Sequence, residues 1–455
     1  MSAVTIVWTL LVLVVGLVVA GVLYHVGNVL FVACRWVYRW VRIAMAKGVR
    51  RARLLHAQQI RRWWKRDCKS LGLVHTYQRE RRDGHVQTVT VKPKIVAAAE
   101  PWGVRVRMGT VPGVGITEVE RHATHLADCW RAESIEVERM RHGTVEMRVI
   151  DGDLIAEHRP YPWPTDRDAW VLPIGHNAWG EPVVISLPDV PGVKVGGLSG
   201  FGKTVLLSGW AAGFADRPEV QFVVLDGKTR NPTLGDWSIL DGRAMAMVGD
   251  DPEQANAQLV QLVELVKSRP ERLRAERGTH KFWTHGPTTD NPLVVVVLDE
   301  AHNYVDIAGT SRADREVIEA NQRHIRTLVK EGRSTGVVSI PATQKATADA
   351  LPTAIRDNLP VGVCFATSTP EAAEAVLGAG IRADEPNLPT NLRDKTRYQG
   401  VCVVTGLPGL DGRYARVRVG DIHDDELTAR LADTAHLRRD LADLIGPPRH
   451  LEVVA

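Results

Sequence analysis

Cysteine is scarce in this chain, and its spacing excludes two common architectures. The 455 residues include five cysteines, and no two of them form a C-x-x-C pair. An odd, scattered set argues against a disulfide framework and against a zinc knuckle. The sequence therefore predicts no zinc or other structural metal and fits a reducing compartment.

Acidic residues are absent from a long segment near the start of the chain. Between Arg35 and Arg66 there are eleven Lys or Arg residues and no Asp or Glu, although the net charge is only +4. No Lys or Arg precedes this segment, and Val4 to Tyr24 is an uncharged apolar run long enough to cross a bilayer as a helix. A cleaved signal peptide would need a basic start and a shorter apolar core.

This charge pattern predicts an orientation in the membrane. Because positive charge favours the cytoplasmic side, we expect the N-terminus outside and everything after Arg35 in the cytoplasm. Residues 1–34 are then a single-pass anchor in the cell (inner) membrane, followed by a basic juxtamembrane helix at 35–67. Residues 26–45 interleave arginines with aromatic side chains, which suits an interfacial helix on anionic lipid; a second span is the alternative.

The remaining chain is expected to form three parts. Alternating segments at 102–108 and 144–150, with a helical pattern between them, indicate a small α+β domain at 68–160. His122 and His125 lie on that helix, but without a third ligand they are interpreted as surface residues. The proline-rich segment 159–166 indicates a linker. Residues 421–455 are expected to form a helical C-terminal tail.

Residues 161–420 alternate between strand and helix patterns, which is typical of a mostly parallel sheet with helices on its faces. Asp251 and Pro252 are expected to begin one of the helices as its N-cap and first residue. The expected buried strands lie at 193–197, 221–227, 293–300, 336–344 and 361–368.

A glycine-rich loop follows the first of these strands and precedes a helical segment. It reads Gly197-Leu198-Ser199-Gly200-Phe201-Gly202-Lys203-Thr204, which matches G-x-x-x-x-G-K-[ST]. The backbone N–H groups of such a loop and the following helix N-terminus point at phosphates. We expect the residues from Gly197 to Val205 to bind ATP. Lys203 would bridge its β- and γ-phosphates, and the Thr204 hydroxyl would ligate Mg²⁺.

Two adjacent acids end the strand at 293–300. Burial of this strand would place Asp299 at the carboxyl edge of the sheet, where it can hold the Mg²⁺ shell. Glu300 is then positioned to polarise the attacking water as general base. The alternative is a pair of inert strand-end acids.

Three further residues are candidates for the same chemistry. Gln344 ends the next strand and could sense the γ-phosphate or orient water. Arg333 and Arg356 flank that strand, and either could be an arginine finger that reaches the nucleotide of a neighbouring subunit. The alternative for each arginine is a solvated surface position.

These motifs resemble the FtsK/SpoIIIE motor family in content and order. The resemblance is carried by the glycine-rich loop, VVLDGK (223–228), LVVVVLDEAH (293–302) and the segment 332–368, with Arg333 and Gly336 as a specific pair. It covers roughly 170–410, and more weakly 100–155. It implies a RecA-like ATPase that assembles as a homo-hexamer around double-stranded DNA and pumps it. Lys203, Thr204, Asp299 and Glu300 carry over by motif, and Gln344 as the sensor.

The departures from the family shape the functional expectation. The sequence shows one clear span, no long linker, and a tail that is short for a winged-helix module. We therefore expect a membrane-anchored, ATP-driven DNA translocase for intercellular DNA transfer, of the conjugative-element type. A chromosome-partitioning translocase, a protein-export ATPase of the type VII secretion kind and a regulatory ATPase remain alternatives. A superfamily-two helicase is disfavoured, because its second-lobe motif is absent.

Overall fold

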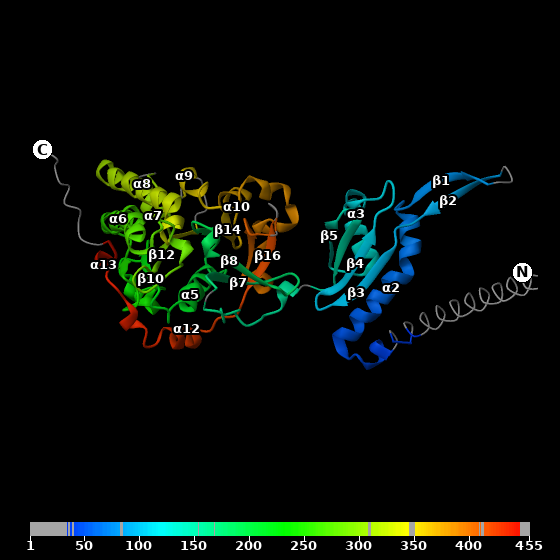
Figure 1. The fold of residues 1–455 in the computed structure, drawn as a ribbon, viewed down its shortest axis with the longest axis horizontal. Coiled ribbons are helices and arrows are strands. Elements are labelled where there is room, and N and C mark those ends of the chain that lie inside the picture. Colours follow the sequence, from blue (N-terminus) through cyan, green and yellow to red (C-terminus); the bar gives the residue numbers. More distant parts are fainter. Residues whose placement is uncertain are drawn as a thin grey trace, which may run out of the picture. The chain divides into compact units, whose positions relative to one another are not determined.

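The computed structural model describes residues 34, 37–38, 41–81, 85–152, 154–167, 169–307, 311–344, 351–408, 410 and 414–445 (Figure 1). The chain divides into two compact units, Met1–Asp153 and Leu154–Ala455. The expected anchor run, Val4 to Tyr24, lies outside the described residues. Among the helices that are described, none is both long and apolar enough to span a membrane.

The first unit is built on a four-stranded antiparallel sheet in the order β3-β4-β6-β5. Its strands are β3 (Ile95–Glu100), β4 (Gly103–Gly109), β5 (Ser134–Arg141) and β6 (Thr144–Ile150). The alternating segments of the sequence thus form β4 and β6, as predicted. Strands β1 (His75–Glu80) and β2 (Val86–Val91) form a separate, largely exposed hairpin.

Helices cover one face of this sheet. They are α2 (Gly48–Ser70), α3 (Ile116–Arg121) and α4 (Ala123–Trp130). The single helix expected after Gly115 is therefore two, separated at His122. Val104 and Val106 of β4 point into the core beneath these helices, while Arg105 and Arg107, which alternate with them, do not. One buried and one open face explain the alternating pattern.

Helix α2 changes the interpretation of the basic segment 35–67. Ile60 and Trp64 of α2 are buried in the core of the first unit. The Trp64 Nε1 donates a hydrogen bond to the Pro93 carbonyl at 2.8 Å, and Trp130 Nε1 donates to Asp67 Oδ2 at 2.9 Å. The later part of the expected juxtamembrane helix is therefore a packed element of the small domain, because its apolar face has a sheet to bury against.

The second unit contains a ten-stranded mixed sheet in the order β11-β10-β12-β13-β9-β14-β15-β16-β7-β8. From β11 to β14 all neighbours are parallel, and the remaining pairs are antiparallel. The strands are β7 (Val171–Asn177), β8 (Pro182–Ser186), β9 (Val193–Gly196), β10 (Val220–Asp226), β11 (Ala246–Val248), β12 (Leu293–Asp299), β13 (Val337–Thr343), β14 (Val361–Cys364), β15 (Val401–Thr405) and β16 (Ala415–Val419).

All five strands expected from the sequence are present in the parallel part of this sheet.

The described helices of the second unit are α5 (Lys203–Gly213), α6 (Pro252–Arg277), α7 (His302–Val305), α8 (Arg312–Thr335), α9 (Thr353–Arg356), α10 (Pro370–Leu377), α11 (Lys395–Tyr398), α12 (Asp424–Leu431) and α13 (Leu441–Ile445). Helix α6 begins as predicted: Asp251 caps it by accepting hydrogen bonds from the backbone N–H groups of Glu253 and Gln254.

Two separate cores lie on the two faces of the central strands. Successive residues of β12 alternate between them: Val295 and Val297 pack with α5, whereas Val294, Val296 and Leu298 pack with α6 and α8. Figure 1 shows α6, α7 and α8 along one side of β10 and β12, with α5 and α12 on the other. Burial on both faces explains the uninterrupted apolar run of β12.

The segments that flank the sheet pack against it. The proline-rich segment 159–166, expected as a linker, belongs to the second unit, where Tyr161 is buried and donates to the Pro173 carbonyl at 2.6 Å. After β16, Leu441 and Leu444 of α13 enter the core beside α6. The Gln221 amide of β10 donates to the Leu437 carbonyl at 2.8 Å. This tail is thus attached to the ATPase-like sheet over its described part.

Candidate nucleotide site

The glycine-rich loop 197–204, called here the phosphate loop, connects β9 to α5. Gly200 (φ +78°) and Gly202 (φ +108°) adopt left-handed conformations that side chains disfavour. A Cβ on Gly197 would lie 2.6 Å from Phe365 Cβ, so the close approach of the residue that follows β14 also requires glycine there. The loop glycines are therefore needed for its shape as well as for ligand access.

Backbone hydrogen bonds fix the ends and the outer side of the phosphate loop. The N–H groups of Gly197 and Leu198 donate to the carbonyls of Thr343 and Ala366. The Gly200 carbonyl accepts from the Gln399 side chain at 3.2 Å, and the Phe201 carbonyl accepts from the Gly400 N–H at 3.0 Å.

The backbone N–H groups in the middle of the phosphate loop, at 199–202, differ from those at its start. Within the described part of the chain, no residue accepts a hydrogen bond from the backbone N–H of 199–202. Successive unsatisfied donors at a helix N-terminus suit the oxygens of a phosphate chain.

Lys203 joins the phosphate loop to the acids at the end of β12. Its Nζ lies 3.1 Å from Asp299 Oδ1 and 3.0 Å from Glu300 Oε1. All three side chains are nearly inaccessible, between 1% and 5% exposed. Because β9, β13 and β12 are adjacent and parallel, their carboxyl ends meet at one edge of the sheet. The two sequence motifs are thereby brought into direct contact.

Glu300 has a strained backbone. Its φ is +49°, a left-handed conformation that is rare for a residue other than glycine, asparagine or aspartate. Its own N–H donates to Asp299 Oδ1 at 3.0 Å, which holds the turn. A strained turn of this kind costs about 1–3 kcal/mol and is typical of functional positions.

Two groups hold the Glu300 carboxylate in addition to Lys203. Oε2 accepts the backbone N–H of Gln344 at 3.0 Å and lies 3.3 Å from His302 Nδ1, which also lies 3.3 Å from Thr343 Oγ1. Burial alone would raise the pKa of Glu300, but His302, Lys203 and the Gln344 N–H outweigh it and lower the pKa to about 2. Glu300 is therefore ionised at neutral pH, as a general base must be.

A third carboxylate lies beside Asp299. Asp226 ends β10 directly opposite Asp299 in the strand register, and it is 1% exposed. Its Oδ1 accepts the Lys228 N–H at 3.1 Å, whereas its buried Oδ2 has no hydrogen-bond partner among the described residues. Burial is the main cause that raises the pKa of Asp226 to about 6; the Lys228 N–H opposes this, and the Asp299 charge adds to it.

The donor set fits a magnesium ion. Thr204, on the first turn of α5, offers a hydroxyl oxygen, and Asp299 offers a carboxylate that Trp237 Nε1 orients by donating to Oδ2 at 3.2 Å. Mg²⁺ in nucleotide sites takes one or two such protein oxygens and completes its shell with phosphates and water. Across the described residues, no group of three or more His, Cys, Asp or Glu could hold a metal without a nucleotide.

The two candidate finger arginines lie at the opposite edge of the sheet. Arg333, in the last turn of α8, precedes β13 and donates from Nε to the Pro188 carbonyl at 3.0 Å. Arg356 precedes β14, and its carbonyl accepts from Lys194 Nζ at 3.4 Å. Both strands run toward the phosphate loop, so neither arginine reaches the site of its own chain. A role for either one requires a second subunit.

Sequence reasoning did not identify His302, Trp237 or the segment 395–400 as parts of the site. His302 follows Glu300 by two residues, so its proximity was open to inference from the LDEAH motif. Trp237 and the segment 395–400 reach the site from loops after β10 and before β15, and no local pattern marks them.

Comparison with known proteins was consistent with this geometry. No protein-family profile matches the chain. A stretch of 253 residues is 24% identical to the DNA translocase FtsK of Bacillus cereus and to the DNA translocase SpoIIIE of Bacillus subtilis. The chain is a distant homologue of the FtsK/SpoIIIE-family P-loop ATPases. Each match covers 50% of this chain but only 30% of the relative.

The solved structures add a likeness of fold. The pCW3 conjugation coupling protein TcpA, in its monomer form with ATPγS, aligns with a TM-score of 0.52 over 82% of this chain and 99% of that chain. The identity is 16%, so this comparison concerns the fold alone. It supports the RecA-like, mixed and mostly parallel sheet for this distant FtsK/SpoIIIE homologue.

Proposed function

We propose that this chain is a membrane-anchored, ATP-driven translocase of double-stranded DNA that serves DNA transfer between cells. The observation that carries the proposal is the contact of Lys203 with Asp299 and Glu300 at the edge of the sheet. The relatives named DNA translocases, and the fold likeness to a conjugation coupling protein, support DNA as the substrate.

The residues at this edge account for the steps of hydrolysis. The N–H groups of the phosphate loop bind the phosphates, and Lys203 leaves its two carboxylate partners to neutralise charge on the transferred phosphoryl group. Mg²⁺, when bound by Thr204 and Asp299, supplies further charge neutralisation. Glu300, freed from Lys203 but still held by His302 and the Gln344 N–H, accepts a proton from the attacking water.

The position of the arginines supports a ring. Because Arg333 and Arg356 lie at the edge remote from their own phosphate loop, they could stabilise the transition state only at the site of a neighbouring subunit. We therefore propose a homo-hexamer in which one subunit completes the nucleotide site of the next. The proposed anchor, residues 1–34, would attach this ring to the inner membrane as a single-pass helix, with the ATPase in the cytoplasm.

ATP hydrolysis by the full-length chain in detergent, with and without long duplex DNA, tests the function. We expect duplex DNA to stimulate the wild type severalfold and Lys203→Ala to be inactive under both conditions. Lys267→Ala, which removes an exposed lysine of α6, is the matched control and should behave like the wild type. A soluble fragment would have to begin before Gly48, since α2 packs against the small domain.

A protein-export ATPase is the main competing function. It would share the nucleotide site, so loss of activity in Lys203→Ala does not separate the two. A wild-type hydrolysis rate that is indifferent to DNA, across duplex lengths and salt concentrations, would reject DNA translocation and favour the export function.

A further inference from the structure

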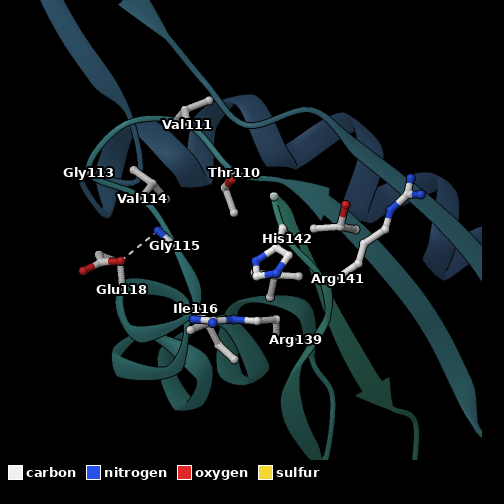
Figure 2. Close-up of a pocket in the computed structure, with 13 residues that line it drawn as sticks. Thr110, Val111, Gly113, Val114, Gly115, Ile116, Glu118, Arg139, Arg141 and His142 are labelled. Atoms are coloured by element: carbon white, nitrogen blue, oxygen red, sulfur yellow. Dashed lines mark hydrogen bonds between the residues drawn. The ribbon is translucent and has the colours of Figure 1, made fainter.

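A cavity lies in the small domain and has no part in the nucleotide site. It has a volume of ≈ 380 Å³, is open to solvent, and is lined by the loop that follows β4, the start of α3 and the turn between β5 and β6 (Figure 2). The loop and the turn are tied together, because the Thr110 N–H donates to the Gly143 carbonyl at 3.0 Å. A bridge between Val111 and Val114 closes the loop on itself. The volume lies within the range of natural ligand sites.

One side of this cavity is cationic. Arg139, Arg141 and His142 line it, and all three are exposed. In the part of the chain that the structure describes, the guanidinium groups of Arg139 and Arg141 have no ion-pair or hydrogen-bond partner. Figure 2 shows Arg139 and His142 turned toward the side of Ile116, while Arg141 extends away along the rim.

A β-bulge explains why the two arginines diverge. The register of β5 against β6 shifts between Arg139, opposite Val145, and Arg141, opposite Thr144. Bulges interrupt the alternation of side chains and are common where a strand directs a residue toward a ligand.

The single carboxylate of the lining does not offset this charge freely. Glu118 Oε2 accepts the Gly115 N–H at 2.8 Å, and this backbone hydrogen bond is the main cause that lowers the pKa of Glu118. The carboxylate is therefore directed to the backbone of its own loop, and no ion pair between described residues joins it to Arg139 or Arg141.

The other side of the cavity is apolar: Val114 and Val145 of the buried core form its floor, and Val111 and Ile116 are partly exposed beside it. A cationic rim facing an apolar wall matches a chain of phosphates linked by sugars, in which charge and apolar surface alternate. An inorganic phosphate would use only the arginines. The exposed rim also leaves room for a polymer to enter and leave.

We propose that this cavity is a second DNA contact, in which Arg139 and Arg141 bind backbone phosphates of the duplex and the partly exposed Val111 and Ile116 lie against the sugars. The contact is independent of base sequence, because it reaches no base edge. The inference rests on the proposed DNA substrate, and it assigns part of DNA binding to the small domain.

Binding of a fluorescent duplex to the full-length chain in detergent, measured by anisotropy over a series of salt concentrations, tests this site. The Arg139→Ala/Arg141→Ala double variant should bind about tenfold more weakly. Its plot of log affinity against log salt should be shallower by about 2, since each lost phosphate contact removes about 0.9 from the slope. Hydrolysis of ATP without DNA should stay at the wild-type rate.

Two further variants complete the design. Arg121→Ala removes an exposed arginine of α3 that does not line the cavity, and it should bind DNA like the wild type. Arg139→Lys/Arg141→Lys keeps the charges and should restore most of the salt slope.

The outcomes separate two claims: the DNA contact in the small domain and the proposed function as a DNA translocase. A double alanine variant with wild-type affinity and slope overturns the site while the proposed function stands. A wild type that binds no duplex overturns both. Loss of binding to anionic phospholipid vesicles, with duplex binding unchanged, would overturn the DNA contact in favour of a lipid headgroup.

Discussion

The ten-stranded sheet and the four-stranded sheet of the small domain bury their strands differently, and the difference decides where chemistry can occur. Every residue of β10, β12 and β13 is buried, because helices cover both faces. In the small domain β4 alternates between buried and more accessible residues, and the last three residues of β5 are exposed.

This contrast explains the two kinds of site. Strands β10 and β12 are covered on both faces and carry their ionisable side chains at their last residues, so Asp226 and Asp299 meet Thr343 at the carboxyl edge, where all three are shielded from water. At this buried edge an ion pair is strong, and the pKa of a carboxyl group is shifted far from its usual value. In the small sheet Arg139 and Arg141 lie in solvent, where they suit a screened, reversible contact such as the one proposed with phosphates.

The acid at the buried edge should matter far more than the acid beside the small-domain cavity. Glu300→Gln should lower the rate of ATP hydrolysis by about 100-fold or more, since it removes the proposed general base. ATP binding, measured with a fluorescent analogue, should persist. The matched change Glu118→Gln should leave hydrolysis unaltered. If both substitutions changed the rate of ATP hydrolysis equally, the proposed difference in function between the two sheets would be wrong.

The two sheets should also differ in how much the loss of one apolar side chain lowers the free energy of unfolding. Leu298→Ala, at a fully buried position of β12, should lower the free energy of unfolding by about 2–5 kcal/mol. Met140→Ala in β5, where the side chain is 48% exposed, should change it by less than about 0.5 kcal/mol. Urea denaturation of both variants measures this. A small loss for Leu298→Ala would mean that the central sheet can collapse around the gap.

Asp226 offers a prediction that depends on pH. Its pKa is raised from 3.8 to about 6, so the folded state holds the proton more tightly than the unfolded state. Stability should therefore fall as the pH rises from about 4 through 6 and stay lower above that. Asp226→Asn should be more stable than the wild type by about 2–3 kcal/mol at pH 8, and by little at pH 4.

Thermal unfolding of Asp226→Asn across this pH range provides the measurement. Its backbone contact should survive, because an amide oxygen can still accept the Lys228 N–H. A variant that loses stability equally at all pH values would show that the carboxylate has a structural partner instead.

Among changes near the nucleotide site, the smallest effect is expected for an exposed pair at the same edge. Lys228 Nζ lies 2.6 Å from Asp236 Oδ2, and both side chains are more than 40% exposed. Asp236→Asn should cost less than about 1 kcal/mol, because solvent screens the pair. A cost in the thermal unfolding free energy comparable to that of Leu298→Ala would contradict this assignment.

Much of the ATPase core was predictable from local sequence. The phosphate loop, the strand that ends in Asp299 and Glu300, and the cap at Asp251 each depend on residues close together in the chain. Periodicity correctly indicated β4 and β6 in the small domain, where one face is covered. The division at His122 was missed, since the apolar spacing continues through it.

Contacts between distant segments were not predictable in the same way. The basic composition of α2 indicated a surface helix, but Ile60 and Trp64 bury it against β3 and β4. The segment 395–400 braces the phosphate loop across two hundred residues of sequence. Such pairings depend on the order of strands in the sheet, which no single segment encodes.

The sequence alone determined which residues can grip phosphate and which acids end a buried strand, because glycine conformations and strand burial are local properties. Only the tertiary structure decided that Lys203 and Glu300 touch, that His302 contacts the Glu300 carboxylate and that Arg333 and Arg356 lie at the far edge. The reason is physical: parallel strands are joined by crossovers, so their order in the sheet, rather than their order in the chain, brings the ends of β9, β13 and β12 together.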